Sequence, residues 1–161
     1  WRAMRTASYI TALFNRTTPD EAPCPELFEL YEELLDLAER FGRHLQFLLW
    51  AEFRFCDHHG HAPNLGDCVL CGSAKELRFC AAQGGLACSS CSKTQKLPTL
   101  PCPPDTLAIL RSWRAAEHPA AVVNTKLTAR QRTDLNAIAG TFMAYHFNLN
   151  PEHRLAALQA A

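Results

Sequence analysis

The sequence has no apolar run of the roughly 20 residues that a helix needs to span a bilayer. The stretch LQFLLWA at residues 45–51 is short and already contains Gln46. The opening WRAMRTASYITALFNR superficially resembles a transit peptide, because it has three arginines and no acidic residue, but it lacks the apolar core of a secretory signal. We therefore expect a soluble protein without a membrane partner, and a folded first helix at the N-terminus.

The chain also lacks an excess of charge, because 16 basic residues balance 16 acidic ones. Bulk attraction cannot draw such a molecule to nucleic acid, so any such binding must come from local clustering. Its 161 residues, 48% apolar and 20% charged, suit one globular domain with a buried core. The sequence begins with Trp1 instead of Met, so we expect it to be the later part of a longer polypeptide.

Catalytic motifs are missing as well. The sequence contains no G-x-S-x-G, no H-E-x-x-H and no phosphate-cradling glycine loop, and we interpret Gly84 and Gly85 as a turn. We expect no enzyme, since an enzyme would need a concave pocket with convergent perturbed groups.

Hydrophobic periodicity predicts a mainly α fold, a helical bundle, whose first half holds three helices. In the first 16 residues, 100° steps give two opposite faces. The expected apolar face holds Met4, Ala7, Ile10 and Phe14, and the other holds Arg2, Arg5, Tyr9 and Arg16. A second helix starts at Pro25 and a third spans about 44–57, and the short link predicts that they pack antiparallel. Their expected buried stripes are Leu27, Leu30, Tyr31, Leu34, Leu37, Ala38 and Phe41, then Leu45, Leu48, Leu49, Glu52, Phe53 and Cys56.

Further helices are expected after residue 100. Pro104 and Asp105 open a short one that ends near His118, and Thr128 with Gln131 matches the capping box that starts the last long helix. A final turn or short helix restarts at Asn150. The expected stripe of the long helix is Leu135, Ile138, Phe142, Tyr145 and Leu149.

Between these halves, residues 61–100 show no helical periodicity and few large apolar residues. Burial alone cannot offset the ordering entropy of such a segment, so a cross-link is expected. Two C-x2-C turns, Cys68 with Cys71 and Cys88 with Cys91, can bring four thiolates together as a tetrahedral set for Zn²⁺. Four thiolates leave no position for water, so the predicted zinc is structural.

Other roles for cysteine and histidine are conceivable. A redox C-x-x-C needs only one pair near a strand–helix junction, and this segment has two pairs. Cys80 follows Phe79 in a hairpin strand and is the one competing ligand. We expect Cys56 in the core and Cys24 and Cys102 in linkers, and we interpret His58, His59 and His61 as solvated or capping groups.

The resulting organisation is one composite domain in three parts. Residues 1–60 form the first part of the bundle. Residues 61–100 form a zinc-finger or ribbon insert with four cysteine ligands and a short β-hairpin, and residues 101–161 complete the bundle.

This order of elements resembles the helical and zinc-finger C-terminal region of the bacterial DNA repair protein family RecO. The segment GHAPNLGDCVLCG, which begins at Gly60, is similar to the family's G-x-x-P-x-L-x-x-C-x-x-C-G, and RFCAAQGGLACSSC is similar to F-S-x-x-x-G-G-x-x-C-x-x-C, with Cys80 where serine is usual. FMAYHF at 142–147 resembles the end of the family's last long helix. The N-terminal oligonucleotide-binding barrel of that family has no counterpart in this sequence, so the resemblance does not carry over barrel-dependent DNA binding.

The resemblance implies a non-enzymatic recombination mediator that binds single- and double-stranded DNA, anneals strands, and acts with RecR and the tail of single-strand-binding protein to load RecA. An alternative is a zinc-stabilised protein-interaction domain without DNA contact. Eight cysteines without a signal sequence, taken with the resemblance, imply the bacterial cytoplasm, at the nucleoid. Two basic stripes are candidate sites for DNA or the acidic tail, against the alternative that they are solvated helix faces. Their members are Arg2, Arg5 and Arg16, and then Arg111, Arg114, Lys126, Arg130 and Arg132.

Overall fold

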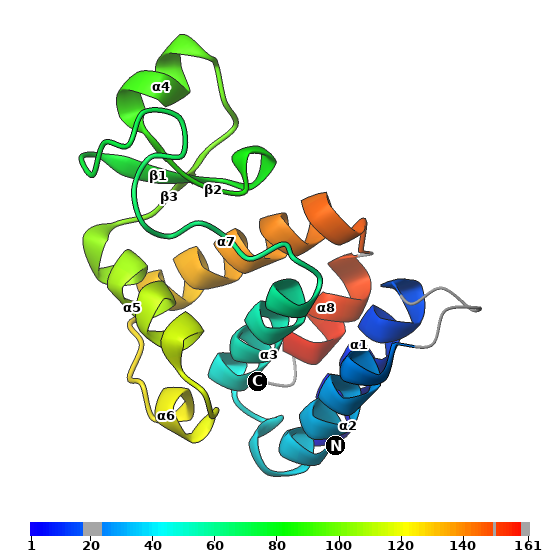
Figure 1. Ribbon diagram of the computed structural model, residues 1–161. Coiled ribbons are helices and arrows are strands. Elements are labelled where there is room, and N and C mark those ends of the chain that lie inside the picture. The colour runs from blue at the N-terminus through cyan, green and yellow to red at the C-terminus, as the bar shows by residue number, and fades with distance from the viewer. Residues whose placement is uncertain (18–23, 150, 159–161) are drawn as a thin grey trace.

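A computed structural model describes residues 1–17, 24–149 and 151–158, without the side chains of Arg2, Pro151 and His153. Over these residues the chain forms eight α-helices, one 3-10 turn and one three-stranded sheet. Seven of the helices gather in one body, and the sheet stands beside them with the short helix α4, next to α7 (Figure 1). The predicted class, a helical bundle with a small cysteine-rich insert that contains a hairpin, is confirmed.

The first half of the bundle consists of α1 (Arg2–Thr17), α2 (Pro25–Phe41) and α3 (Leu45–His58). Pro25 stands in the first turn of α2, where its missing N–H costs no helical hydrogen bond. α2 and α3 run in opposite directions, as their short link predicts (Figure 1). Ten of the fourteen residues of α3 are buried, so this helix is the centre of the bundle.

The predicted faces of α1 are partly wrong. Ile10 and Phe14 are buried as expected, but Met4 is 67% exposed and Tyr9, expected among the arginines, is 3% exposed. The Tyr9 hydroxyl donates a hydrogen bond of 2.7 Å to Oε1 of Glu52 on α3, which turns that side of α1 inward. A buried polar partner on another helix is invisible to periodicity.

The second half consists of α5 (Pro104–Ala115), α6 (Ala120–Val123), α7 (Ala129–Phe147) and α8 (Pro151–Leu158). The capping box of α7 is present, with Gln131 N–H donating to the Thr128 hydroxyl and Thr128 N–H donating to Gln131 Oε1. α5 ends at Ala115 and not near His118, because Ala116 is extended and its carbonyl accepts the Trp50 indole N–H at 2.8 Å.

One member of the predicted α7 stripe is misplaced. Leu135, Ile138 and Phe142 are buried, but Tyr145 is 59% exposed. Its neighbour His146 takes the inward position, with Nε2 at 3.0 Å from the Ala81 carbonyl of the insert. The contact with the insert therefore determines which side of the last turn of α7 is buried.

The insert contains β1 (Leu77–Cys80), the 3-10 turn η1 (Ala81–Gln83), β2 (Gly85–Cys88), α4 (Ser89–Thr94) and β3 (Leu100–Pro101). The antiparallel sheet has the order β2-β1-β3, with Phe79 opposite Leu86. Gly84 has a φ of 67° in the expected turn, and a Cβ on Gly85 would lie 2.3 Å from the Asn64 carbonyl oxygen, so both positions require glycine. α4 and β3 were not predicted.

The insert and the bundle share one core. Phe79 and Leu86 of the hairpin belong to the same buried cluster as Phe142 and Trp50 of the bundle. The division into three parts of one composite domain stays a prediction, and this shared cluster supports it.

Candidate metal centre

The first C-x2-C turn is a compact knuckle. Cys68 N–H donates to the Ser73 carbonyl at 2.9 Å, and Gly72 N–H donates to the Cys68 carbonyl at 2.8 Å. Gly72 has a φ of 71°, a conformation that glycine adopts without strain. The knuckle therefore folds so that Cys68 and Cys71 face the same point.

The second pair uses a helix start. Cys88 ends β2 and is the N-cap of α4, where its sulfur accepts the Cys91 N–H at 3.4 Å. Cys91 lies in the first turn of α4. A strand end and a helix N-terminus thus present two sulfurs together.

The four sulfur atoms fit one tetrahedral ion. Sγ of Cys68, Cys71, Cys88 and Cys91 all lie within 4.8 Å of one another, and Cys71 Sγ lies 3.7 Å from Cys88 Sγ. Zn–S bonds of about 2.3 Å in tetrahedral geometry place sulfurs about 3.8 Å apart. None of these cysteines is in a disulfide. The residues can hold a metal ion, and the four-thiolate donor set is the one that suits zinc.

Electrostatics in this cluster call for a cation. Desolvation opposes ionisation of Cys68, but hydrogen bonds from the backbone N–H groups of Cys88, Leu70 and Cys71 outweigh it and lower the pKa of Cys68 to about 6. Thiol hydrogen bonds with Cys71 and Cys88 raise the pKa of Cys91 to about 12. The Cys68 thiol therefore ionises readily, whereas ionisation of Cys91 beside it is unfavourable unless a cation compensates for the added negative charge.

The other cysteines and the histidines lie outside this donor set. Cys80 is fully buried beside the cluster but is not among the four grouped sulfurs. Cys56 is buried with its Sγ 3.5 Å from Met143 Sδ, Cys102 is buried, and Cys24 is exposed. Among the described residues, the cysteine quartet is the one group of three or more candidate ligands, and it includes no histidine.

The N-terminal basic stripe is only partly placed. The Arg5 guanidinium lies over the Trp1 ring at 3.9 Å and donates to the Ala156 carbonyl, and Arg16 is exposed in the last turn of α1. The side chain of Arg2 lies outside the described part of the chain.

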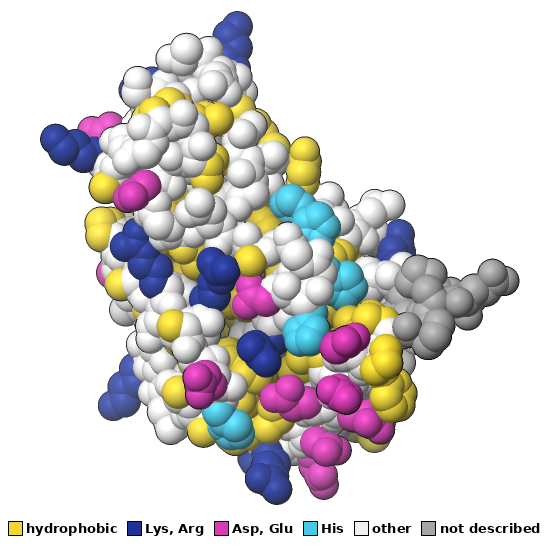
Figure 2. Space-filling model, in the orientation of Figure 1, with side chains coloured by type: hydrophobic (Ala, Val, Ile, Leu, Met, Phe, Trp, Pro, Cys, Tyr) yellow, Lys and Arg dark blue, Asp and Glu magenta, His cyan; other side chains and the backbone are white. Residues whose placement is uncertain are grey.

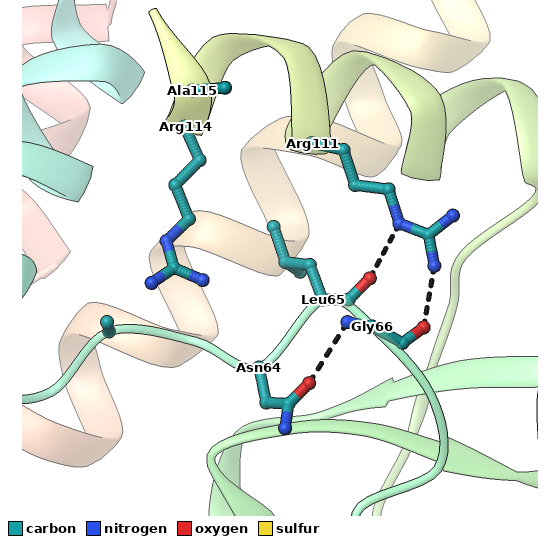
Figure 3. A pocket seen from close by; sticks show the side chains of 7 residues that line it. Asn64, Leu65, Gly66, Arg111, Arg114 and Ala115 are labelled. Atoms are coloured by element: carbon teal, nitrogen blue, oxygen red, sulfur yellow. Dashed lines mark hydrogen bonds between the residues drawn. The ribbon is translucent and has the colours of Figure 1, made fainter. Parts of the chain in front are cut away.

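The second basic stripe divides into three kinds of environment. Arg130 forms ion pairs with Asp105 and Asp134, so its charge is compensated. Lys126 and Arg132 are exposed. Arg111 and Arg114 reach from α5 to a loop of the insert and donate to its backbone carbonyls, with both guanidinium groups beside the same groove (Figure 3).

Sequence reasoning missed one buried polar centre. Arg154 of α8 pairs with Glu52 of α3 through two bonds of 2.7 and 3.0 Å, and its Nη1 donates to Asn136 Oδ1 at 2.5 Å. Burial opposes the charge of Arg154, but Glu52 raises its pKa, and burial together with Glu52 raises the pKa of Tyr9. An acidic residue on the apolar stripe of the third helix was the available sign, because a buried carboxylate needs a partner.

No helix among the described residues is both long and apolar enough to cross a bilayer.

The fold and the site define a class: a helical domain with an inserted hairpin and four grouped cysteines that can hold a metal ion. Residues 1–156 match the family described as Recombination protein O C terminal. The chain belongs to the RecO family.

Two curated relatives agree with this assignment. The DNA repair protein RecO of Syntrophus aciditrophicus is 36% identical over 116 residues, which cover 69% of this chain and 45% of that protein. The DNA repair protein RecO of Myxococcus xanthus is 30% identical over 143 residues, which cover 87% of this chain and 55% of that protein. The chain thus spans about half the length of these relatives. No solved structure shows a significant match.

Proposed function

We propose that this chain is a non-enzymatic recombination mediator module of bacterial DNA repair. In this role it binds DNA, promotes annealing of complementary strands, and docks RecR and the tail of single-strand-binding protein, so that RecA is loaded in the cytoplasm at the nucleoid. The observation that carries the proposal is the family match over residues 1–156, which includes all four cysteines of the metal centre.

The metal in this proposal is a structural zinc ion. The four thiolates fill every position of a tetrahedral ion, which leaves no place for a water to be activated or a substrate to be polarised. The ion would hold the knuckle and the start of α4 together and so fix the hairpin against α7.

An uneven charge distribution supports contact with a polyanion. Acidic side chains gather over α2, whereas basic ones lie over α5 and the adjoining loop (Figure 2). A neutral chain with separated charges attracts nucleic acid on one side and repels it on the other. The exposed acidic residues of α2 are Glu26, Glu29, Glu32, Glu33, Asp36 and Glu39.

A second candidate is a zinc-stabilised interaction domain without DNA contact. It is favoured by the ion pairs of Arg130, because a compensated arginine gives little to phosphate binding. In that case the insert orders a protein-docking surface.

Salt dependence separates the two functions. The metal-loaded chain is titrated against a labelled oligonucleotide from low to physiological salt, and against RecR in parallel. A mediator that neutralises phosphates loses oligonucleotide affinity steeply as salt rises. Absent or salt-insensitive oligonucleotide binding, with RecR binding retained, would favour the interaction domain.

A further inference from the structure

A groove separates the loop at residues 62–66 from helix α5. Its volume is about 720 Å³. Arg111 and Arg114, one turn apart on α5, both extend from the helix toward the loop (Figure 3). The groove is lined by Ala62, Asn64, Leu65, Gly66, Arg111, Arg114 and Ala115.

Backbone carbonyls hold both arginines in place. Arg111 donates from Nε to the Leu65 carbonyl and from Nη2 to the Gly66 carbonyl, both at 2.6 Å, and Arg114 donates from Nη1 to the Pro63 carbonyl at 2.8 Å. A carbonyl accepts a hydrogen bond but carries no net charge. The guanidinium groups are therefore fixed in position while their positive charge remains.

Two carboxylates lie near these arginines, because Asp57 pairs with Arg114 and Asp67 lines a neighbouring pocket with Arg111. Arg111 forms no ion pair with a described residue, and Arg114 meets one carboxylate, that of Asp57, at 3.6 Å. Nη1 of Arg111 and Nη2 of Arg114 have no acceptor within the described ranges. The groove thus differs from the surroundings of Arg130, where two aspartates compensate for one arginine.

A third guanidinium, that of Arg54, is not among the groups that line the groove. Arg54 lies three residues before Asp57 on α3, hence on the same face of that helix. Its Nε is buried and lacks a hydrogen-bond partner in the described part of the chain. Oδ1 of Asp57 is likewise buried without a hydrogen bond among the described residues, so the cations that line the groove are Arg111 and Arg114 alone.

The loop wall of the groove is built on the metal-held hairpin. Asn64 N–H donates to the Gly84 carbonyl at 2.8 Å, and Leu86 N–H donates to the Asn64 carbonyl at 3.1 Å. The loop then continues to the metal ligand Cys68, and the strand continues to Cys88. The C-terminal end of the loop and the strand that supports its middle both lead to the sulfur cluster, which pre-organises the groove for a ligand.

We propose that this groove binds the phosphodiester backbone of a nucleic-acid strand, with Arg111 and Arg114 as the phosphate-binding residues. Guanidinium groups bind phosphate oxygens through paired, charge-assisted hydrogen bonds. The remaining lining is backbone, two alanines, the Asn64 amide and one buried leucine, so a peptide with large apolar anchors finds no pocket for them. The inference rests on the proposed function and gives it a site.

The test measures fluorescence anisotropy of a labelled oligothymidylate with the metal-loaded chain at several salt concentrations. The double variant Arg111→Gln/Arg114→Gln is compared with Arg43→Gln, which removes an exposed cation between α2 and α3. The double variant should bind about tenfold more weakly at low salt, and the slope of log affinity against log salt should fall by about 1.4, or about 0.7 for each phosphate that is no longer neutralised. Arg43→Gln should change neither quantity.

Arg111→Lys is a control that separates the loss of charge from the loss of structure. It keeps the positive charge but cannot donate both hydrogen bonds to the Leu65 and Gly66 carbonyls. It should retain the wild-type salt slope. A folded double variant with an unchanged slope overturns the groove and leaves the proposed function standing, whereas a wild-type chain that binds no oligonucleotide at any salt overturns both. Displacement of the oligonucleotide by equal charge concentrations of polyglutamate or inorganic phosphate would show a site for any anion and would also overturn the groove as a strand site.

Discussion

The bundle and the insert obtain their shape in opposite ways. The bundle surrounds α3, ten of whose fourteen residues are buried, and it needs no cross-link. One side of the insert joins the bundle core through Phe79 and Leu86, but around its sulfurs there is a separate cluster of only four buried residues, Cys68, Cys80, Ala87 and Cys88. Apolar burial is spread over many small contributions, whereas a metal site concentrates its stabilisation in four bonds.

The two regions meet at the C-terminal half of α7. The Phe79 and Phe142 rings lie 5.8 Å apart, and Phe142 is followed one turn later by His146, which contacts the Ala81 carbonyl. The positions of Phe79 and Ala81 depend on the folding of the hairpin and its turn, and the positions of Phe142 and His146 depend on α7. Damage to either region can therefore be measured separately from damage to the other.

The largest expected effect is loss of one thiolate. Cys68→Ala leaves three sulfurs, so most of the metal-binding free energy, on the order of 10 kcal/mol for structural zinc sites, is lost from the insert. Elemental analysis should show a sharp fall in bound zinc, while far-UV circular dichroism should show that most of the helix remains. Cys80→Ala is the matched control and should keep its metal. Full zinc content in Cys68→Ala would refute the ligand assignment.

The next effect falls on the bundle. Arg154→Ala leaves the buried Glu52 carboxylate without its ion-pair partner, with only the Tyr9 hydroxyl still bonded to it, and should lower the free energy of unfolding by about 3–5 kcal/mol. Urea denaturation followed by helical ellipticity measures it, and zinc content should not change. The double variant Glu52→Leu/Arg154→Met should recover much of the stability, since it removes the stranded charge as well. A double variant as unstable as the single one would contradict this account.

A smaller effect is expected at the start of α7. Thr128→Ala removes the side-chain half of the capping box and should cost about 1 kcal/mol. Thr128→Ser keeps the acceptor oxygen and should stay close to wild type. Thermal unfolding of the three proteins decides the point, and equal midpoints for all three would show that this cap contributes nothing.

The smallest effect concerns pH at the contact between the two regions. Burial lowers the pKa of His59 and of His146 below the ordinary value of 6.5. The unfolded chain therefore binds protons first on acidification, so the stability present above pH 6.5 is lost as pH falls toward the folded-state pKa values. Unfolding midpoints between about pH 7.5 and 5.5 should fall less in His146→Gln than in wild type. A steeper decline in the variant would contradict the assignment.

Local rules were enough for the long helices and for the grouping of the four cysteine sulfurs. Thr128 with Gln131 marked a helix start, and the two C-x2-C turns marked a metal site, because each pattern acts within one turn of backbone. They failed at two tyrosines. Tyr9 was expected to be exposed but is buried against Glu52 of α3, and Tyr145 was expected to be buried but is exposed, because its neighbour His146 contacts Ala81 of the insert. Those partners lie far away in the sequence, beyond the reach of periodicity.

By itself the sequence determined the class of fold, the grouping of four cysteine sulfurs and the neutral total charge, since composition and short-range spacing carry that information. Only the tertiary structure decided how the charges are used: it paired Arg154 with Glu52 inside the bundle, compensated Arg130, and left Arg111 and Arg114 beside an open groove. The physical reason is that the energy of a charge depends on its burial and on its nearest opposite charge, and both are set by segments far apart in the chain.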